Sequence, residues 1–547
     1  MCLDKTKHGW WKDAVFYQIY PKSFKDTTGN GIGDLRGIIA GLDHLQKLGI
    51  DGIWISPVCC SPQVDNGYDI SDYCGIDPMF GTMEDMEELI GQAEARGISI
   101  ILDLVLNHSS DRHPWFIEAR KGRDNPYHGY YIWRDGDGIT PPNDMRSVFG
   151  GSAWTYVPEL GQYYFHQFAP EQPDLNWENP ELRRALYDSI LFWVRKGVKG
   201  FRLDVIDQIA KEPDACITIN GPKLHDFLQE LSREAFYDKS LVTVGEAWGA
   251  DVERAAQYSR EDGTELSMVF QFEHKGLDQE PGGPKWHYRP LYLADLKKCY
   301  CRWQQGLHGR GWNSLFLNNH DLPRVLSRWG DPNGYPVESA KMLATMLYGM
   351  EGTPYIYQGE ELGMTNIRLP IEAYVDLEIR NYYEECMSRG EDRDVVMERI
   401  YARGRDNART PMQWTAGENG GFTTGTPWLP INENYRYINA VAQHEDPESV
   451  FTYYRTLIAL RKKYPVFREG WFSLIEEENQ RVFAYRRDSQ RDHLLVVCNF
   501  SGEEQTFPVP SDFMAGIKLI GNYEGIEARL RPYEAYMLFY EERSKEE

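Results

Sequence analysis

The sequence predicts a (β/α)8 barrel that carries an inserted small domain and a C-terminal all-β domain. Short apolar runs bounded by glycine or polar residues alternate with segments whose apolar residues recur at helical spacing. This alternation is typical of a parallel sheet whose strands are covered on both faces. Eight runs fit as strands, which is the number that closes a barrel. They cover residues 14–20, 52–56, 98–104, 198–204, 241–246, 267–272, 313–319 and 354–357.

The segments between these strands carry the pattern of amphipathic helices. In residues 37–49, apolar side chains occur at 38, 39, 42, 45 and 48, which places them on one helical face. Helices in this position are the crossovers that join parallel strands. Further helices are predicted over 83–96, 180–196, 222–236, 291–305 and 338–349.

Two segments depart from the alternation. Residues 108–173 are rich in Gly, Pro, Tyr, Trp and His, and they predict a small domain inserted after the third strand. The barrel then comprises residues 1–107 and 174–470, with an irregular polar stretch at 365–435. From 471 to 547, short alternating strands predict a separate antiparallel β domain.

Composition excludes several classes of partner. The 547 residues carry a formal charge of −24, which disfavours nucleic acid and anionic membranes because both bind basic patches. The sequence has no run of 18 apolar residues and no apolar core of a signal peptide, so no membrane partner is expected. The nine cysteines lack metal-binding spacing and are expected to be reduced thiols of a cytoplasmic protein. A monomer is expected.

Three carboxylates end predicted strands or follow them closely. Asp204 lies in GFRLDVID, Glu246 in VTVGEAWG and Asp321 in LFLNNHDLPR. The C-terminal ends of barrel strands converge on one mouth, where catalytic residues collect. An Asp and a Glu held together over a sugar are sufficient to cleave a glycosidic bond. The sequence therefore indicates an enzyme that cleaves glycosides.

Seven motifs occur in order along the chain: YQIYPKSF, DLVLNHSS, QPDLNW, GFRLDVID, VTVGEAWG, NNHD and RDNARTPMQW. Together they resemble the α-amylase family of glycoside hydrolases. Within it, they resemble the group of oligo-1,6-glucosidases, α-glucosidases and trehalose-6-phosphate hydrolases. The resemblance runs from about residue 10 to about residue 540. A remote alternative is a non-catalytic relative of the same fold, but such relatives carry a membrane span and lose catalytic carboxylates.

The resemblance implies a role for each of the three carboxylates. Asp204 matches the nucleophile, Glu246 the general acid/base, and Asp321 the third carboxylate, which binds sugar hydroxyls. Arg202 lies two residues before Asp204 on the same face of the strand, where its charge would hold Asp204 ionised. Asp103 matches a residue that orders the site. No cofactor is expected to take part in the chemistry.

The resemblance also implies the residues that surround the substrate. His108 and His320 match two histidines at the first sugar, and Tyr68 matches a stacking floor beneath it. Asp65 and Arg405 resemble a pair that clamps the hydroxyls of a terminal glucose. A pocket closed in this way makes an enzyme exo-acting.

Two aromatic residues are candidates for the leaving-group side of the pocket. Phe149 and Phe168 are expected as walls there, with packing in the protein core as the alternative. The substrate is expected to be a short oligosaccharide or a disaccharide.

A possible metal loop lies at residues 26–34, DTTGNGIGD. Its oxygen-bearing side chains alternate and its glycines permit a sharp turn, as in a calcium or magnesium loop. The related enzymes read D-x-N-x-D-x-I-x-D here, so this chain has one carboxylate fewer. The alternative is a metal-free loop closed by its own Asx turns. The expected ligands of a structural Ca²⁺ or Mg²⁺ are Asp26, Thr28, Asn30, Asp34 and the Ile32 carbonyl.

The function that the sequence favours is a retaining exo-α-glucosidase of the oligo-1,6-glucosidase type. Val205, after the nucleophile, favours α-1,6 linkages, whereas GEAWG resembles α-1,4-specific maltases. The segment that follows the fourth strand is short, which leaves the substrate open. The other alternative, a trehalose-6-phosphate hydrolase, would need cations at the mouth of the pocket. Candidates for these are Lys223, Lys285 and Arg289.

Overall fold

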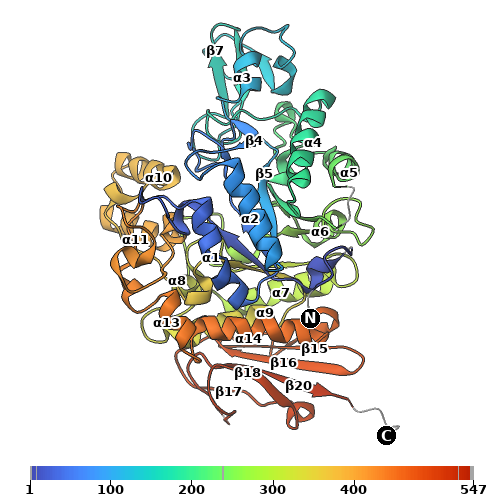
Figure 1. Cartoon of the computed structure of the whole chain (residues 1–547), viewed down its shortest axis with the longest axis vertical. Coiled ribbons are helices and arrows are strands. Elements are labelled where there is room, and N and C mark those ends of the chain that lie inside the picture. The colour runs from blue at the N-terminus through green and yellow to red at the C-terminus, as the bar shows by residue number, and fades with distance from the viewer. Residues whose placement is uncertain (1–2, 8, 237–239, 528, 543–547) are drawn as a thin grey trace.

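A parallel barrel of eight strands forms the centre of the molecule (Figure 1). The computed structural model describes residues 3–7, 9–236, 240–527 and 529–542. The strands are adjacent in the order β11-β10-β9-β5-β2-β1-β13-β12. A parallel bridge between Val269 and Asn313 brings the two edge strands together, and Ser314 Oγ donates to the Val269 carbonyl at 2.7 Å. The strands are β1 (Phe16–Ile19), β2 (Gly52–Ile55), β5 (Ser99–Val105), β9 (Gly200–Asp204), β10 (Val242–Glu246), β11 (Met268–Phe270), β12 (Ser314–Leu315) and β13 (Thr353–Tyr357).

The predicted fold class is confirmed, and each of the eight predicted strands is present. The seventh is much shorter than the predicted 313–319, because the chain leaves the sheet after Leu315. The Asn318 side chain instead accepts from the Val325 N–H, and the Asn319 side chain accepts from the Asp321 N–H. These Asx contacts give the backbone a turn in place of strand pairing.

Some of the barrel helices begin at side-chain caps, and the predicted ones end close to their predicted limits. Asp34 accepts the Gly37 N–H at the start of α1 (Leu35–Leu48), and Thr82 forms a capping box with Asp85 at α2 (Met83–Ala95). The sequence interpretation missed α6 and α8, which have only seven and five residues. The other barrel helices are α4 (Pro180–Arg195), α5 (Leu224–Ala235), α6 (Val252–Tyr258), α7 (Leu293–Leu307), α8 (Val325–Trp329) and α9 (Pro336–Tyr348).

The segment between β5 and β9 folds into a small antiparallel sheet at one end of the molecule (Figure 1). Its strand order is β6-β8-β7, and short bridges from His108 to Asp174 and from Tyr131 to Leu175 tie it to the barrel. Its own core contains Trp154 and Phe165. Its elements are α3 (Pro114–Ala119), β6 (Trp133–Asp135), β7 (Trp154–Val157) and β8 (Gln162–Phe165), and the hairpin β3 (Cys59–Cys60) with β4 (Asp72–Ile76) precedes β5.

An antiparallel sheet of five strands lies at the opposite end, in the order β14-β15-β16-β20-β18. Helices α9 and α14 lie between this sheet and the barrel (Figure 1). The remaining strands are β14 (Trp471–Ile475), β15 (Val482–Asp488), β16 (Asp492–Asn499), β17 (Gln505–Thr506), β18 (Ile517–Gly521), β19 (Arg529–Leu530) and β20 (Ala535–Glu541). The remaining helices are α10 (Leu377–Ser388), α11 (Arg393–Arg403), α12 (Asp406–Arg409), α13 (Ala440–Glu445), α14 (Val450–Lys463) and α15 (Val466–Glu469).

Two sequence expectations concern the molecule as a whole. Among the described residues, no helix is long and apolar enough to cross a membrane. Eight cysteines are free thiols, and Cys2 lies outside the described residues.

Candidate active site

The site is built around one buried arginine at the C-terminal ends of three adjacent strands. Arg202 is 1% exposed and pairs in register with Asp103 of β5. Its Nη1 donates to Asp103 Oδ1 at 2.8 Å and to Asp204 Oδ1 at 2.7 Å, and its Nη2 lies 2.5 Å from Glu246 Oε2. A single guanidinium therefore joins the residues expected as ordering residue, nucleophile and general acid/base.

Burial disfavours the ionised forms of Asp103 and Asp204 in this cluster. Burial raises the pKa of Asp204 well above its usual range, while the Arg202 guanidinium opposes that shift and the charge of Glu246 adds to it. Three carboxylates face one fixed positive charge, so the fully ionised cluster would carry excess negative charge in a medium of low dielectric constant. The Arg202 guanidinium is therefore the contact that favours the ionised form of Asp204 against burial.

The backbone between the two central carboxylates takes an unusual conformation. Val205, directly after Asp204, is left-handed with φ 35° and ψ 46°, although a branched side chain disfavours that region. In this conformation its N–H donates to Glu246 Oε2 at 3.1 Å. The turn after the expected nucleophile thus also contacts the expected acid/base.

Residues of β1, β2 and the loops after β2 and β12 pack against this cluster. Asp103 Oδ2 accepts from the Tyr68 hydroxyl at 3.0 Å and from Trp54 Nε1 at 3.1 Å. The Tyr68 hydroxyl also lies 2.7 Å from His320 Nε2, and the two rings stack at 5.5 Å. Gln18 Nε2 contacts His320 Nδ1 at 2.8 Å. Burial lowers the pKa of His320 to about 3, so its ring is neutral near pH 7.

Asp321 belongs to a second group of charged residues, which also contains Asp376, Arg405 and Arg409. It accepts from Arg409 Nη2 at 2.9 Å and lies 3.4 Å from Arg405 Nη1. Arg405 Nη2 also contacts Asp376 at 2.5 Å and Asp65 at 3.8 Å. Burial would raise the pKa of Asp321, but the neighbouring His320, Arg405 and Arg409 hold it well below its usual range.

The remaining predicted substrate residues are linked to these groups. Gln172 Nε2 lies 3.3 Å from Asp65 Oδ2 and 3.1 Å from His108 Nε2. Burial lowers the pKa of His108 to about 4 and raises that of Asp65 to about 7. Phe168 lies next to His108 with ring centroids 5.1 Å apart, and Phe149 lies 5.7 Å from Phe168.

The Phe149 ring also lies under Arg405, 5.6 Å from its guanidinium carbon. All predicted catalytic and substrate residues thus form one connected region of the structure.

Several members of the site were not found from the sequence. Arg409 lies inside the quoted motif RDNARTPMQW, and an arginine four residues after Arg405 was a usable signal. Asp376 stands alone in a polar stretch, where nothing in the sequence distinguishes it. Its pKa is lowered to about 2, because Arg405 and Arg409 outweigh the effect of burial.

Phe272 and Lys275, which pack with Trp248 beside Glu246, were also not found from the sequence. Trp248 is 42% exposed and stacks on Phe272 at 4.3 Å with an interplanar angle of 5°. Lys275 Nζ lies 3.6 Å from the centroid of the Trp248 ring. Burial and the charge of Lys285 lower the pKa of Lys275 to about 7, while Asp321 and Glu246 oppose the shift. This stack faces the carboxylates with a hydrophobic surface and an ammonium group.

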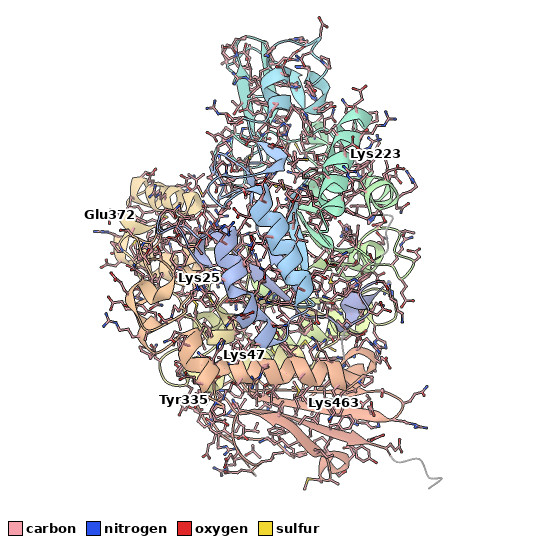
Figure 2. The ribbon with its side chains drawn as sticks, viewed as in Figure 1. Lys25, Lys47, Lys223, Tyr335, Glu372 and Lys463 are labelled. Carbon is pink, nitrogen blue, oxygen red and sulfur yellow. The ribbon has the colours of Figure 1, made fainter. Side chains whose placement is uncertain are left out.

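The three cations considered for phosphate recognition occupy different places. Lys223 lies on the outer surface beside α4 and α5 and pairs with Glu178 at 2.6 Å (Figure 2). Arg289 lies 3.6 Å from Asp295 and over the Tyr292 ring. Lys285 pairs with Glu378, which in turn contacts Arg405 at 3.3 Å. Of the three, Lys285 is the one connected to the site through a described contact.

The predicted metal loop is closed by hydrogen bonds within the chain. Asp26 accepts the N–H groups of Thr28, Gly29 and Gly31 at 2.7 to 2.9 Å, and the Thr423 hydroxyl at 2.5 Å. These donors outweigh burial and lower the pKa of Asp26.

The other predicted ligands of the loop are similarly engaged. Asp34 accepts from Thr27 and caps α1, and the Asn30 side chain accepts the Ile32 N–H at 2.8 Å. As placed, the carboxylates of Asp26 and Asp34 face separate donors and do not fit one shared cation. The structural Ca²⁺ or Mg²⁺ stays a prediction, and the hydrogen bonds within the loop favour its alternative, a metal-free loop closed by Asx turns at Asp26 and Asn30.

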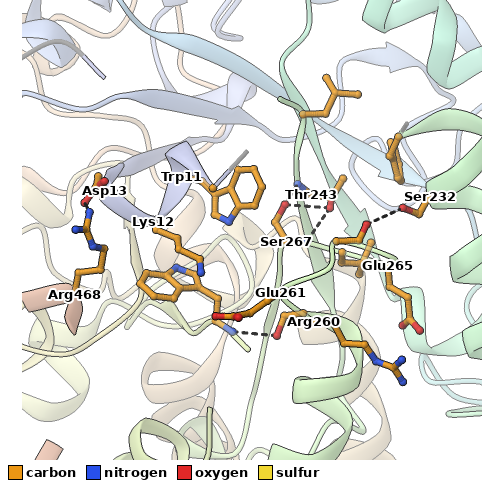
Figure 3. Close-up of a pocket in the computed structure, with 17 residues that line it drawn as sticks. Trp11, Lys12, Asp13, Ser232, Thr243, Arg260, Glu261, Glu265, Ser267 and Arg468 are labelled. Atoms are coloured by element: carbon orange, nitrogen blue, oxygen red, sulfur yellow. Dashed lines mark hydrogen bonds and ion pairs between the residues drawn. The ribbon is translucent and has the colours of Figure 1, made fainter. Parts of the chain in front are cut away.

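A separate cavity of about 360 Å³ lies at the N-terminal ends of β10 and β11 (Figure 3), at the opposite end of these strands from Asp204 and Glu246. Trp11 and Trp312 form part of its wall. Its hydroxyl groups bond to one another or to the backbone, since Thr243 Oγ1 accepts from the Ser267 N–H at 2.9 Å. Residues at this end of a barrel serve stability rather than catalysis.

Comparison with known proteins agrees with this geometry. Residues 18–470 match the model of the alpha amylase catalytic domain, and residues 472–537 match that of the maltogenic amylase C-terminal domain. The chain is 52% identical to an oligo-1,6-glucosidase from Parageobacillus thermoglucosidasius, over 96% of this chain and 98% of that protein. It is 51% identical to a glucan 1,6-alpha-glucosidase from Streptococcus pneumoniae, over 91% and 93%.

A solved structure shows the same fold over nearly the whole length. The crystal structure of a trehalose-6-phosphate hydrolase from Bacillus licheniformis superimposes with a TM-score of 0.93 at 44% identity. The match covers 97% of this chain and 100% of that chain.

Proposed function

The chain belongs to the alpha-amylase family of glycoside hydrolases, and on that premise we propose that it is a retaining exo-α-glucosidase that releases glucose from short α-1,6-linked glucosides. The observation that carries the proposal is the pairing of Asp204 and Glu246 on one buried guanidinium, together with a second charged group in which Arg405 contacts Asp65 and Asp321.

The chemistry follows from the two carboxylates on Arg202. Asp204 attacks the anomeric carbon while Glu246 gives its proton to the departing oxygen, so the glycosidic bond breaks as an ester forms. Glu246, now ionised, takes a proton from water, and the water oxygen displaces Asp204 from the sugar. Two inversions at one carbon return the α configuration. Asp321, held ionised by Arg405 and Arg409, binds the hydroxyls of the same ring.

The charged residues around Arg405 support release from the end of a chain. Asp65, Asp321 and Asp376 all lie within 3.8 Å of the Arg405 guanidinium. We propose that this charged group closes the site where a longer glucan would otherwise continue. A closed end of this kind accepts one terminal glucose and turns away internal segments of a polymer. Glucose is therefore proposed as the product.

The α-1,6 preference rests on two supports. Relatives named as oligo-1,6-glucosidase and glucan 1,6-alpha-glucosidase share about half of the sequence over nearly the full length. Val205 also presents a branched side chain next to the nucleophile. We further propose a monomer in a reducing cytoplasm, where the free thiols stay reduced.

Side-by-side hydrolysis of isomaltose, maltose, sucrose, trehalose and trehalose 6-phosphate tests the proposal. The highest kcat/KM is expected for isomaltose. A trehalose-6-phosphate hydrolase would instead give its highest value with the phosphorylated sugar, and that outcome would overturn the substrate assignment. An α-1,4-specific maltase would prefer maltose.

A further inference from the structure

Asp207 is a buried carboxyl group that the reaction described above does not use. It lies three residues after Asp204 in the short 3-10 helix Ile206–Gln208 and is 0% exposed. Its Oδ2 accepts the Gly249 N–H at 2.7 Å. Its Oδ1 is buried and has no hydrogen-bond partner within the part of the chain that the structure describes. Buried polar atoms almost always have a hydrogen-bond partner, so an unsatisfied oxygen beside the proposed catalytic residues calls for an explanation.

The contacts of Asp207 join the two turns that follow the catalytic strands. The Asp207 carbonyl accepts the Asn220 N–H at 2.8 Å, and the Asn220 side chain donates to the Gly249 carbonyl at 3.1 Å. A Cβ on Gly249 would lie 2.4 Å from the Asn220 side-chain nitrogen, so the approach is close. The turn after Glu246 is thus held against the turn after Asp204 from both sides of Gly249.

These two turns share Glu246 as a common point. Val205 donates its N–H to Glu246 Oε2 at 3.1 Å, and its backbone is left-handed. Such a conformation costs about 1–3 kcal/mol and persists when surrounding contacts over-determine it. Asp207 supplies one of these contacts two residues further on.

We propose that Asp207 is a positioning residue, which keeps the general acid/base Glu246 oriented toward the leaving oxygen by tying the turn after the nucleophile to the turn after the acid. The inference rests on the catalytic roles proposed above. It assigns Asp207 an effect on proton donation and no direct contact with the sugar.

The charge of Asp207 gives this role a pH signature. Burial raises the pKa of Asp207 to about 7; the Gly249 N–H opposes the shift and the charge of Glu246 adds to it. The titratable groups that face Asp207 are Glu246 from β10 and Tyr258 from α6. Glu246 also faces Arg202, Asp204 and Lys275. The negative charge on Asp207 therefore develops as the pH rises through about 7, and it lies close to Glu246.

The first test separates proton donation from general structural damage. Isomaltose has a poor leaving group that needs protonation, whereas α-glucosyl fluoride releases fluoride without it. Asp207→Ala is expected to lower kcat/KM for isomaltose about tenfold or more, and that for the fluoride less than about twofold. An equal loss on both substrates, or no loss on either, would overturn the proposal.

The second test uses a variant that keeps the hydrogen bond. In Asp207→Asn the side-chain oxygen still accepts the Gly249 N–H, but no charge develops above pH 7. The alkaline limb of kcat/KM for isomaltose is expected to move to lower pH. An unchanged limb contradicts the proposal, and this variant decides the matter if Asp207→Ala does not fold.

Asp51→Asn provides a matched control. Asp51 is 7% exposed and accepts the Val15 N–H at 2.9 Å, as Asp207 accepts that of Gly249, but it lies near the start of β2, where that strand enters the barrel. Its substitution should lower the melting temperature without separating the two substrates. If the wild-type protein cleaves the fluoride and none of the disaccharides, the proposed function fails. The role of Asp207 is then tested separately: a loss of activity on the fluoride in Asp207→Ala as large as on the true substrate would overturn it.

Discussion

The backbone N–H of Val205 donates to Glu246 Oε2 at 3.1 Å, so the residue after the proposed nucleophile is in direct contact with the proposed acid/base. Val205 is 5% exposed and left-handed, which fixes its side chain at the end of β9. A substitution here therefore acts on the leaving-group side of the reaction and not on the bound terminal glucose.

Val205→Thr and Val205→Ala are expected to raise cleavage of maltose relative to isomaltose. The branched apolar side chain restricts the close approach of an α-1,4-linked sugar and tolerates the more flexible α-1,6 arm. Steric selection of this kind amounts to about 1–3 kcal/mol, or roughly ten- to two-hundred-fold. The measurement is the ratio of the two kcat/KM values in wild type and variants. A wild type that already prefers maltose, or a ratio that does not move, contradicts the prediction.

Asp204→Asn should abolish hydrolysis while the fold survives. Loss of a covalent nucleophile costs about 10⁴-fold or more in turnover, and the amide can still accept from Arg202. Activity on isomaltose and the circular dichroism spectrum are the two readouts. Asp188→Asn on the exposed face of α4 is the control and should keep full activity. Near-normal turnover by the Asp204 variant would remove it from the mechanism.

Newly released glucose should appear first as the α-anomer. A double displacement at the anomeric carbon retains configuration, whereas a single displacement by water inverts it. Proton NMR recorded before mutarotation distinguishes the two. Early β-glucose would exclude the covalent intermediate on Asp204.

His113 should make the protein less stable in acid. Its Nδ1 accepts the Trp115 N–H at 3.1 Å at the start of α3, which requires a neutral ring. Burial lowers its pKa to about 4, from 6.5 for an exposed histidine. Below pH 6.5 the unfolded chain binds a proton that the folded chain does not, so the contribution, about 3 kcal/mol, is lost as pH falls from 6.5 to 4.

The measurement is the free energy of unfolding against pH for wild type and His113→Asn. Asparagine can cap the same helix without titrating, so its curve should be flatter across this range. Parallel curves for the two proteins would show that His113 does not contribute as described.

The loop at 26–34 should keep its stability without a divalent cation. Asp26 is already satisfied by three N–H groups and by Thr423. Treatment with EDTA is expected to leave the melting temperature unchanged. Thr423→Val, which removes a buried donor to a carboxylate, should lower it by an amount that corresponds to about 1–3 kcal/mol.

Thr426→Val, at an exposed position in the same segment, is the control for that substitution. A melting temperature that falls on chelation and recovers with Ca²⁺ or Mg²⁺ would support the cation-binding alternative instead.

Much of the fold was predictable because local pattern and tertiary structure agree. Strands such as Gly200–Asp204 are buried along their whole length, so they read as apolar runs between turn residues. Asp204, Glu246 and Asp321 stand out because each interrupts or ends such a run. The length of β12 was wrong because Asn318 and Asn319 form side-chain contacts that no periodicity reveals.

The missed parts of the site depend on contacts between distant residues. Asp376 meets Arg405 across 29 positions, and Trp248 meets Lys275 through the packing of two neighbouring loops. The left-handed backbone of Val205 was equally hidden, since a valine predicts the opposite. These features arise only when the barrel brings the loops together.

The separation of charges along the chain has a consequence for biosynthesis. Arg202 is made two residues before Asp204, so the nucleophile leaves the ribosome together with its counter-ion. Asp321 must wait a further 84 and 88 residues for Arg405 and Arg409. Until then its carboxylate has neither guanidinium and favours water over burial. During synthesis, the contact between Asp204 and Arg202 can therefore form early. The contacts of Asp321 with Arg405 and Arg409, which we propose close the substrate site, are among the last of the barrel to form.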